Sequence, residues 1–218
     1  RSGLLLQESF EDELLRFNLP IKVKNKPDLT LKDIYVFPDL DPILDNIDTF
    51  GQYIDSNELA EHSYEGHTVI VEGETQSGKS SLLNMLYLMK FKQGRYPLYI
   101  KGIDINTEHT AAILEKAYKN QYDFKRTPYE IYKQQSKEDK ILFIDNLDKS
   151  CLNDEYRKVV ISKLEKHFGT LIITMKDDVD LHCVNYSGKS NAYVSRYRIS
   201  SLGSLKRNEL IEKWVRVN

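Results

Sequence analysis

The chain has 218 residues, 40% of them hydrophobic and 29% charged, which is typical of a soluble globular protein with a substantial core. No apolar run reaches the about 18 residues that a membrane-spanning helix needs, and no signal peptide is visible, so we expect a cytoplasmic protein without a membrane partner. The net charge is −2, with 6 basic and 14 acidic residues in 1–65; the mildly positive remainder suits a polyphosphate ligand but does not indicate nucleic acid. Cys151 and Cys183 lack metal-binding spacing and are expected to be buried thiols.

Residues 1–65 are predicted as an N-terminal appendage of helices and strands, with a linker, placed before the main domain. The segments expected within it are a short amphipathic helix over 9–17, a strand over 33–37, a turn over 39–42, and one or two helices over 43–59. Its many acidic side chains are interpreted as a solvated face, and no chemistry is assigned to them.

A strand, a glycine-containing turn and a helix are predicted in succession over residues 67–88. The apolar, β-branched run 68–71 predicts a buried strand, and leucines at 82, 83 and 86 have the spacing of a helix. The turn between them reads Gly73-Glu74-Thr75-Gln76-Ser77-Gly78-Lys79-Ser80, which is the G-x-x-x-x-G-K-S pattern of a phosphate-binding loop. Because the strand and the helix supply the context that this motif requires, nucleotide binding is favoured over an ordinary glycine turn.

Each part of this turn has a chemical role. The glycines let the backbone curl so that successive N–H groups surround the phosphates, and the helix adds the positive end of its dipole. Lys79 is predicted to reach the β- and γ-phosphates, and the hydroxyl of Ser80 to ligate Mg²⁺. The residues expected to contact the nucleotide are Gly73, Glu74, Thr75, Gln76, Ser77, Gly78, Lys79, Ser80 and Ser81.

Three elements are expected between this helix and the next informative strand. Residues 97–103 predict a second strand, and Asn106 or Thr107 is expected to cap a helix. The sequence Thr127-Pro128-Tyr129-Glu130 resembles a capping box, so another helix is expected to run from there to about Gln135.

The apolar run 141–144 predicts a strand buried on both faces, as in a parallel sheet. Asp145 follows at the edge where open α/β sheets bind ligands, so it is the candidate to hold Mg²⁺ through its water shell. Asp148 either activates the attacking water, helps with the metal, or caps the following helix, for which 153–155 is a better start. Thr174, near the end of a fourth strand over 170–175, either senses the γ-phosphate or has a structural role.

The C-terminal part contains a strand and a helix. Residues 187–190 repeat a G-K-S sequence, but Cys183 stands where a second phosphate-binding loop needs glycine. The strand 192–199 carries Arg196 and Arg198 on one face, which either reaches phosphates or a neighbouring subunit or is simply solvated. A last helix, capped by Ser204 and running to about 215, is expected to bury Leu210, Ile211 and Trp214.

The motifs GETQSGKS and ILFIDNLDK, followed by LIIT, resemble those of the STAND or NACHT-like branch of P-loop ATPases, with the KAP ATPases as the nearest alternative. The resemblance implies an α/β P-loop NTPase fold, with a mostly parallel sheet of about five strands sandwiched by helices. It implies an ATPase core over 66–200, the start of a truncated helical lid over 201–218, and the strand of Thr174 between the other two motif strands. It also implies Mg²⁺ on Asp145, Asp148 as a second acid and Thr174 as a polar sensor.

Three positions depart from related patterns. Asn146 follows Asp145 where AAA+ enzymes have glutamate, and Lys149 and Lys176 replace residues common in STAND proteins. We therefore expect slow hydrolysis of ATP to ADP. The resemblance implies a switch module of a larger signalling or defence protein, which binds ATP with Mg²⁺ and forms homo-oligomers.

Two alternatives remain open. A GTPase is suggested by residues 175–178, which nearly spell the guanine-reading motif, although Met175 lacks the required polar contact and Asp148 stands where glycine is needed. A nucleotide-binding scaffold without turnover is supported by Asn146 and Lys149. Direct nucleic-acid handling has only four basic residues near the C-terminus in its favour and is not indicated.

Overall fold

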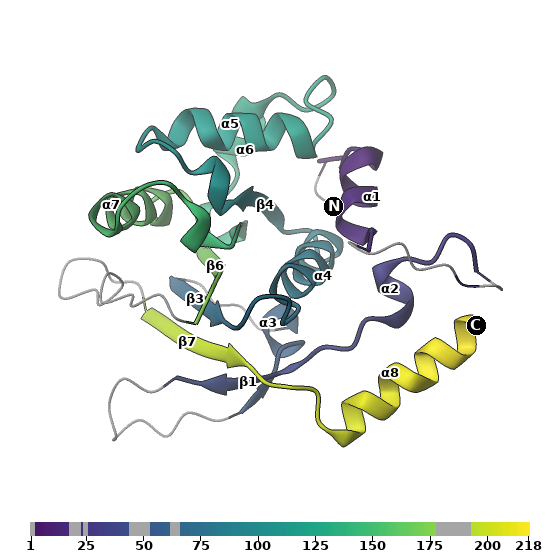
Figure 1. The fold of residues 1–218 in the computed structure, drawn as a ribbon. Helices are drawn as coiled ribbons and strands as arrows, with labels where there is room; N and C mark the ends of the chain where they lie inside the picture. Colours follow the sequence, from purple (N-terminus) through teal and green to yellow (C-terminus); the bar gives the residue numbers. More distant parts are fainter. Residues whose placement is uncertain (1–2, 18–22, 24–25, 44–52, 62–65, 178–192) are drawn as a thin grey trace.

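The computed structural model describes the whole chain except residues 1–2, 18–22, 24–25, 44–52, 62–65 and 178–192 (Figure 1). Its centre is one sheet with the strand order β2-β1-β7-β3-β6-β5-β4. The strands are β1 Asp39–Pro42, β2 Ile54–Asp55, β3 His67–Glu72, β4 Tyr96–Lys101, β5 Lys140–Asp145, β6 Thr170–Met175 and β7 Tyr193–Ile199. The helices are α1 Glu8–Leu15, α2 Leu31–Ile34, α3 Glu58–Glu61, α4 Lys79–Lys92, α5 Thr110–Gln121, α6 Tyr129–Gln134, α7 Asp154–Glu165 and α8 Ser204–Val217, with 3₁₀ turns η1 Gly102–Asp104, η2 Lys137–Asp139 and η3 Leu147–Lys149.

The five strands from β7 to β4 run parallel, and their carboxyl ends share one edge. The three strands β3, β5 and β6 are buried along almost their whole length, because helices cover both faces of the sheet. This confirms the predicted α/β P-loop NTPase fold with a mostly parallel sheet. It also confirms that the strand of Thr174 lies between the strands of the two motifs.

The two faces of the sheet form two separate apolar clusters. On one face, α1, α3 and α4 pack on β3 and the middle of β5. On the other face, α5, α6 and α7 pack on β4, β5 and β6 (Figure 1). The same carboxyl edge of the sheet is therefore bordered by helices from both layers.

The N-terminal segment differs from its prediction in three places. The predicted strand over 33–37 is wrong: α2 occupies Leu31–Ile34, and it begins there because the Asp33 carboxylate accepts hydrogen bonds from the backbone N–H and the hydroxyl of Thr30, at 2.8 and 2.9 Å. The predicted turn over 39–42 is strand β1, which pairs antiparallel with β7. The described part of 43–59 contains β2 and the start of α3 instead of longer helices.

Because β1 and β2 extend the sheet of the core, the N-terminal segment shares that sheet with the remainder of the chain. The division of the chain at residues 65 and 66 stays a prediction. The helix predicted over 9–17 is confirmed as α1, which buries Phe10 and Leu14.

Four smaller predictions need correction. Thr127 does not cap α6, because its hydroxyl donates to the Gly3 carbonyl at 3.3 Å instead. Helix α5 begins at Thr110, later than expected. Helix α8 buries none of its residues fully, and Ile211 is exposed. Cys151 is exposed as well, whereas Cys183 and residues 187–190 lie outside the described residues.

Candidate functional site

The turn between β3 and α4 has the backbone of an open nest. Gln76 and Gly78 have left-handed conformations, with φ of 67° and 94°. A side chain at Gly73 would place its Cβ 2.6 Å from the Ser77 hydroxyl oxygen, so any larger residue there would require the Ser77 side chain to move. Glu74, Thr75 and Gln76 are exposed at the top of the turn, and Gly78 begins α4. The turn therefore presents backbone groups at the positive end of a fourteen-residue helix.

Lys79 lies across the base of this turn. It is 6% exposed, and its ammonium donates to the carbonyl oxygens of Gly73 and Glu74, both at 2.5 Å. Burial lowers the pKa of Lys79, while the carboxylates of Asp148, Asp177 and Asp145 act in the opposite direction. The lysine thus holds a positive charge against the turn in a partly desolvated setting.

Asp145, at the end of β5, faces Ser80 at the start of α4. The Ser80 hydroxyl lies 2.9 Å from each carboxylate oxygen of Asp145, which is 8% exposed. Thr174, fully buried at the end of β6, donates to the same carboxylate at 3.0 Å. The sequence predicted all three residues, and the strand order brings them together at one point of the sheet edge.

Asp148 and Thr174 each have a defined structural contact. The Thr174 hydroxyl accepts the backbone N–H of Asn146 at 2.9 Å, and the Asp148 carboxylate accepts the N–H of Lys176 at 3.2 Å. Asp148 does not cap α7, because Asn153 does so by accepting the N–H of Tyr156 at 3.0 Å. The charge of Asp148 remains close enough to Lys79 to act on its pKa.

Tyr99 is a member of this site that the sequence analysis missed. It lies on β4, is 7% exposed, and borders a cavity of about 300 Å³ together with Ser80 and Asp145. Burial first, and then the charge of Asp145, raise the pKa of Tyr99 well above its usual value, so its hydroxyl stays protonated. Asp145 therefore accepts the hydroxyls of Ser80 and Thr174, and the Tyr99 hydroxyl lies close enough to feel its charge. A signal for Tyr99 would have required knowing that β4 neighbours β5.

A cavity of about 620 Å³ adjoins the phosphate-binding turn. It is bordered by residues 31–38 of the N-terminal segment, the end of β7, and Leu210 of α8. Lysines of α8 hold that border: Lys206 donates to the Phe37 carbonyl at 2.5 Å and Lys213 to the Tyr35 carbonyl at 2.6 Å. The Tyr35 hydroxyl is buried and has no hydrogen-bond partner among the described residues.

The two arginines of β7 have different surroundings. Arg196 forms an ion pair with the buried Glu72 at 2.6 Å, which ties β7 to β3. Arg198 is exposed and borders the 620 Å³ cavity. Of the pair singled out in the sequence, only Arg198 therefore lies at the candidate site.

The residues at Asp145 fit Mg²⁺. Carboxylate and hydroxyl oxygens are the ligands that this hard cation prefers, and it commonly takes its remaining ligands from phosphates and water. In the described part of the chain, no cluster of three or more His, Cys, Asp or Glu residues is placed to hold a metal ion. A magnesium ion at Ser80 and Asp145 would therefore depend on phosphate oxygens to complete its shell.

No protein-family model matches this chain, and no curated protein matches its sequence. Several solved structures have a similar fold. The replication initiator DnaA bound to AMPPCP and single-stranded DNA is 17% identical, with a TM-score of 0.44 over 74% of this chain and 49% of that chain. Saccharomyces cerevisiae RIF2 is 14% identical, with a TM-score of 0.46 over 75% and 60%. Drosophila ORC bound to DNA is 14% identical, with a TM-score of 0.44 over 72% and 30%.

The chain spans about half the length of the DnaA structure. At identities of 14–17% and TM-scores of 0.44–0.46, these similarities carry no argument about this chain. Within the described residues, none of the helices has both the length and the apolar character that crossing a membrane requires.

Proposed function

We propose that this chain binds ATP with Mg²⁺ and hydrolyses it slowly. One observation carries the proposal: Ser80, at the end of the open phosphate-binding turn, directly faces the buried Asp145 at 2.9 Å. A hydroxyl and a carboxylate next to a nest of backbone N–H groups form a combined anion and cation site. A nucleoside triphosphate with its magnesium ion supplies both charges.

The proposed roles follow from position. Lys79 binds the β- and γ-phosphates, and Ser80 and Asp145 hold Mg²⁺, which when bound neutralises charge on the phosphate oxygens. Asp148 orients or deprotonates the attacking water, and Thr174 senses the γ-phosphate through Asp145. The backbone and side chains that surround the nucleotide are those of Gly73, Glu74, Thr75, Gln76, Ser77, Gly78 and Ser81.

The base and ribose are proposed to occupy the 620 Å³ cavity. Its volume is in the range of small-molecule sites, and its apolar side chains, such as Leu31, Val36 and Leu210, suit a flat base. The cavity joins the phosphate-binding turn at Gly73 and Gly78, so one nucleotide can span both. ADP, which lacks only the γ-phosphate, is expected to bind in the same place.

Two substitutions test the proposal. Lys79→Ala is expected to weaken ATP binding by about tenfold or more, the usual loss for a charge-assisted contact. Asp145→Ala is expected to remove the Mg²⁺ dependence of binding. Lys92→Ala, at the exposed far end of α4, is the matched control and leaves affinity unchanged. Calorimetric titration that finds unaltered affinity in both site variants would reject nucleotide binding here.

A nucleotide-binding scaffold without turnover is the second candidate, and Asn146 favours it. This residue follows Asp145 in a left-handed conformation with φ of 54°, and its amide nitrogen lies 3.4 Å from the Ser80 hydroxyl. An amide cannot take a proton from water. Phosphate release in a single-turnover assay separates the candidates: release that Asp148→Asn abolishes supports hydrolysis, and no release from the unaltered protein supports the scaffold.

The finer proposal is a STAND-type switch, in which ATP and ADP states of a larger signalling or defence protein differ in homo-oligomeric assembly. It rests on the motif resemblance together with Asn146, since slow hydrolysis suits a switch. Light scattering of the protein with ATP and with ADP tests it, because a switch requires different masses. Competition between ATP and GTP tests the GTPase alternative, which Met175, 1% exposed on β6, does not favour.

A further inference from the structure

Helix α1, from the N-terminal segment, is docked next to the candidate metal site. Its Phe10 packs edge-on against Tyr87 and Tyr99, with ring centroids 5.5 and 6.5 Å apart. The side-chain amide of Asn84, on α4, donates to the carbonyl of Leu14 at 2.9 Å. The helix is thus attached both to the phosphate-binding helix and to the tyrosine that contacts Asp145.

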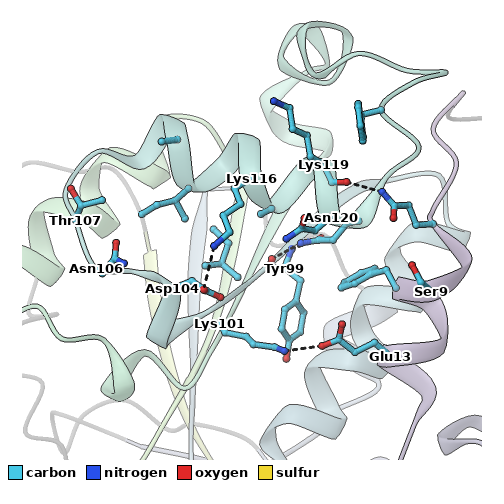
Figure 2. Close-up of a pocket in the computed structure, with 18 residues that line it drawn as sticks. Ser9, Glu13, Tyr99, Lys101, Asp104, Asn106, Thr107, Lys116, Lys119 and Asn120 are labelled. Carbon is cyan, nitrogen blue, oxygen red and sulfur yellow. Dashed lines mark hydrogen bonds and ion pairs between the residues drawn. The ribbon is translucent and has the colours of Figure 1, made fainter.

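Glu13, on the last turn of α1, pairs with Lys101 at the end of β4. The ammonium lies 2.7 Å from the Glu13 carboxylate, and Figure 2 shows the two side chains meeting beside Tyr99. Both side chains are more than half exposed. Exposed ion pairs contribute little to stability, so the pair is better understood through where it holds the lysine.

Lys101 also lies close to the carboxylate of Asp145. In the parallel pairing of β4 with β5, Lys101 stands directly opposite Asp145, one strand spacing of about 4.8 Å away. Asp145 already bears on the charge state of Lys101, as does Asp104. Without Glu13, the carboxylates that still attract this flexible ammonium are those of Asp104 and of Asp145, the residue proposed to hold Mg²⁺.

Tyr99 lines two cavities, one together with the Glu13–Lys101 pair and one together with Asp145. It lines the cavity of about 690 Å³ between α1 and α5 together with Glu13 and Lys101 (Figure 2). It also lines a smaller cavity of about 300 Å³ that contains Ser80 and Asp145. Tyr99 therefore lies between the Glu13–Lys101 pair and the carboxylate that faces Ser80.

We propose that α1 makes the metal site competent: Glu13 holds Lys101 away from Asp145, and Tyr99, braced by Phe10, orients the Asp145 carboxylate toward Ser80. Glu13, Lys101 and Tyr99 are positioning residues, because none of them touches the nucleotide. The inference rests on the proposed binding of ATP with Mg²⁺. It adds that docking of the N-terminal helix controls the affinity of this site for the cation.

A double-mutant cycle tests the role of Glu13. The measurement is the Mg²⁺ concentration at half-maximal binding of a fluorescent ATP analogue. Glu13→Gln is expected to raise this midpoint about threefold to fivefold, the size of an exposed charge interaction, because it releases Lys101 toward Asp145. Lys101→Met is expected to leave the midpoint unchanged or lower it, and the double variant is expected to behave like Lys101→Met.

A merely structural ion pair gives a different pattern. In that case Glu13→Gln and Lys101→Met lower thermal stability equally and leave the Mg²⁺ midpoint unchanged. An unchanged midpoint in Glu13→Gln, or a raised midpoint that persists in the double variant, would overturn the role of Glu13. Both side chains are exposed, so the variants are expected to fold.

Tyr99→Phe tests the second half of the proposal. It keeps the ring against Phe10 and removes the hydroxyl, so the Mg²⁺ midpoint is expected to rise while affinity for ATP without Mg²⁺ is unchanged. Equal midpoints in Tyr99→Phe and the unaltered protein would remove Tyr99 from the proposal. Failure of the proposed function has a distinct signature, because the unaltered protein would then bind no ATP and Lys79→Ala would have no binding to weaken.

Discussion

The candidate site has two sides that are built differently. On the phosphate side, Lys79, Asp145 and Thr174 are buried and hydrogen-bonded to one another or to the turn. The other side is the 620 Å³ cavity in which we propose that the base binds, and we call it the base side. There α8 has no fully buried residue, and lysine side chains hold it to the backbone at Tyr35 and Phe37. Elements with few buried contacts open at lower free energy than the core. We therefore expect α8 to move before the phosphate side does.

A pair of glycine substitutions gives the largest expected difference between the two sides. A Cβ at Gly102, just after β4, would lie 2.0 Å from the Asn146 carbonyl oxygen, whereas a Cβ at Gly203, before α8, meets nothing within 4 Å. Gly102→Ala is expected to destabilise the fold by about 4 kcal/mol or more, and Gly203→Ala by about a few tenths. Urea unfolding measures both. Similar losses of unfolding free energy in the two variants would contradict the expected difference between the two sides.

Thr174→Val is expected to have the next largest effect, on the phosphate side. It removes a hydroxyl that hydrogen-bonds to Asp145 in a buried setting and to the Asn146 N–H in a partly buried one. Leaving such groups without a partner costs about 1–3 kcal/mol, so the free energy of unfolding should fall by about 2 kcal/mol. Thr174→Ser, which keeps the hydroxyl, is the control. If both substitutions cost the same, packing rather than hydrogen bonding accounts for the loss.

Lys206→Met addresses the base side. Its ammonium bridges Asp39 and Asp55, at 2.9 and 2.7 Å, and the Phe37 carbonyl. We expect a loss of about 1 kcal/mol, since the partners are partly exposed, and the loss should shrink as salt is added. Arg216→Met, whose pair with Glu212 is exposed on the same helix, is the control. The loss in the free energy of ATP binding should be larger than the loss in the free energy of unfolding, because α8 borders the base cavity.

The two sides also differ in how far the sequence could predict them. The turn 73–80 and Asp145 belong to continuous patterns, since each lies at the end of an apolar run; the strand order around them came from the family resemblance of these motifs. Strand β1 has four residues and exists because it pairs with β7, about 155 residues later in the chain. Local propensity does not encode such a pairing, so residues 39–42 were interpreted as a turn.

The same reason explains the residues that were missed. Tyr99 is an ordinary aromatic residue of a buried strand until β4 is placed beside β5. The base cavity combines residues 31–38, the phosphate-binding turn and α8, which no single segment foreshadows. Leu210 and Trp214 were expected in a core by their helical spacing, but α8 packs on α2 rather than on the sheet (Figure 1).

The smallest effect concerns a lysine that the phosphate-binding helix buries. Lys90, on α4, is 5% exposed, and burial, with a smaller effect of Arg95, lowers its pKa to about 8. The unfolded chain, with a lysine pKa of about 10.4, therefore binds more protons than the folded protein between these values, so stability rises with pH there and levels off well below pH 8. We expect a gain of about 1 kcal/mol between pH 7.5 and 9.5, before the buried tyrosines ionise. Thermal unfolding of the unaltered protein and of Lys90→Met over this range measures it: the slope should become smaller in the variant, and an unchanged slope would assign the pH dependence to another group.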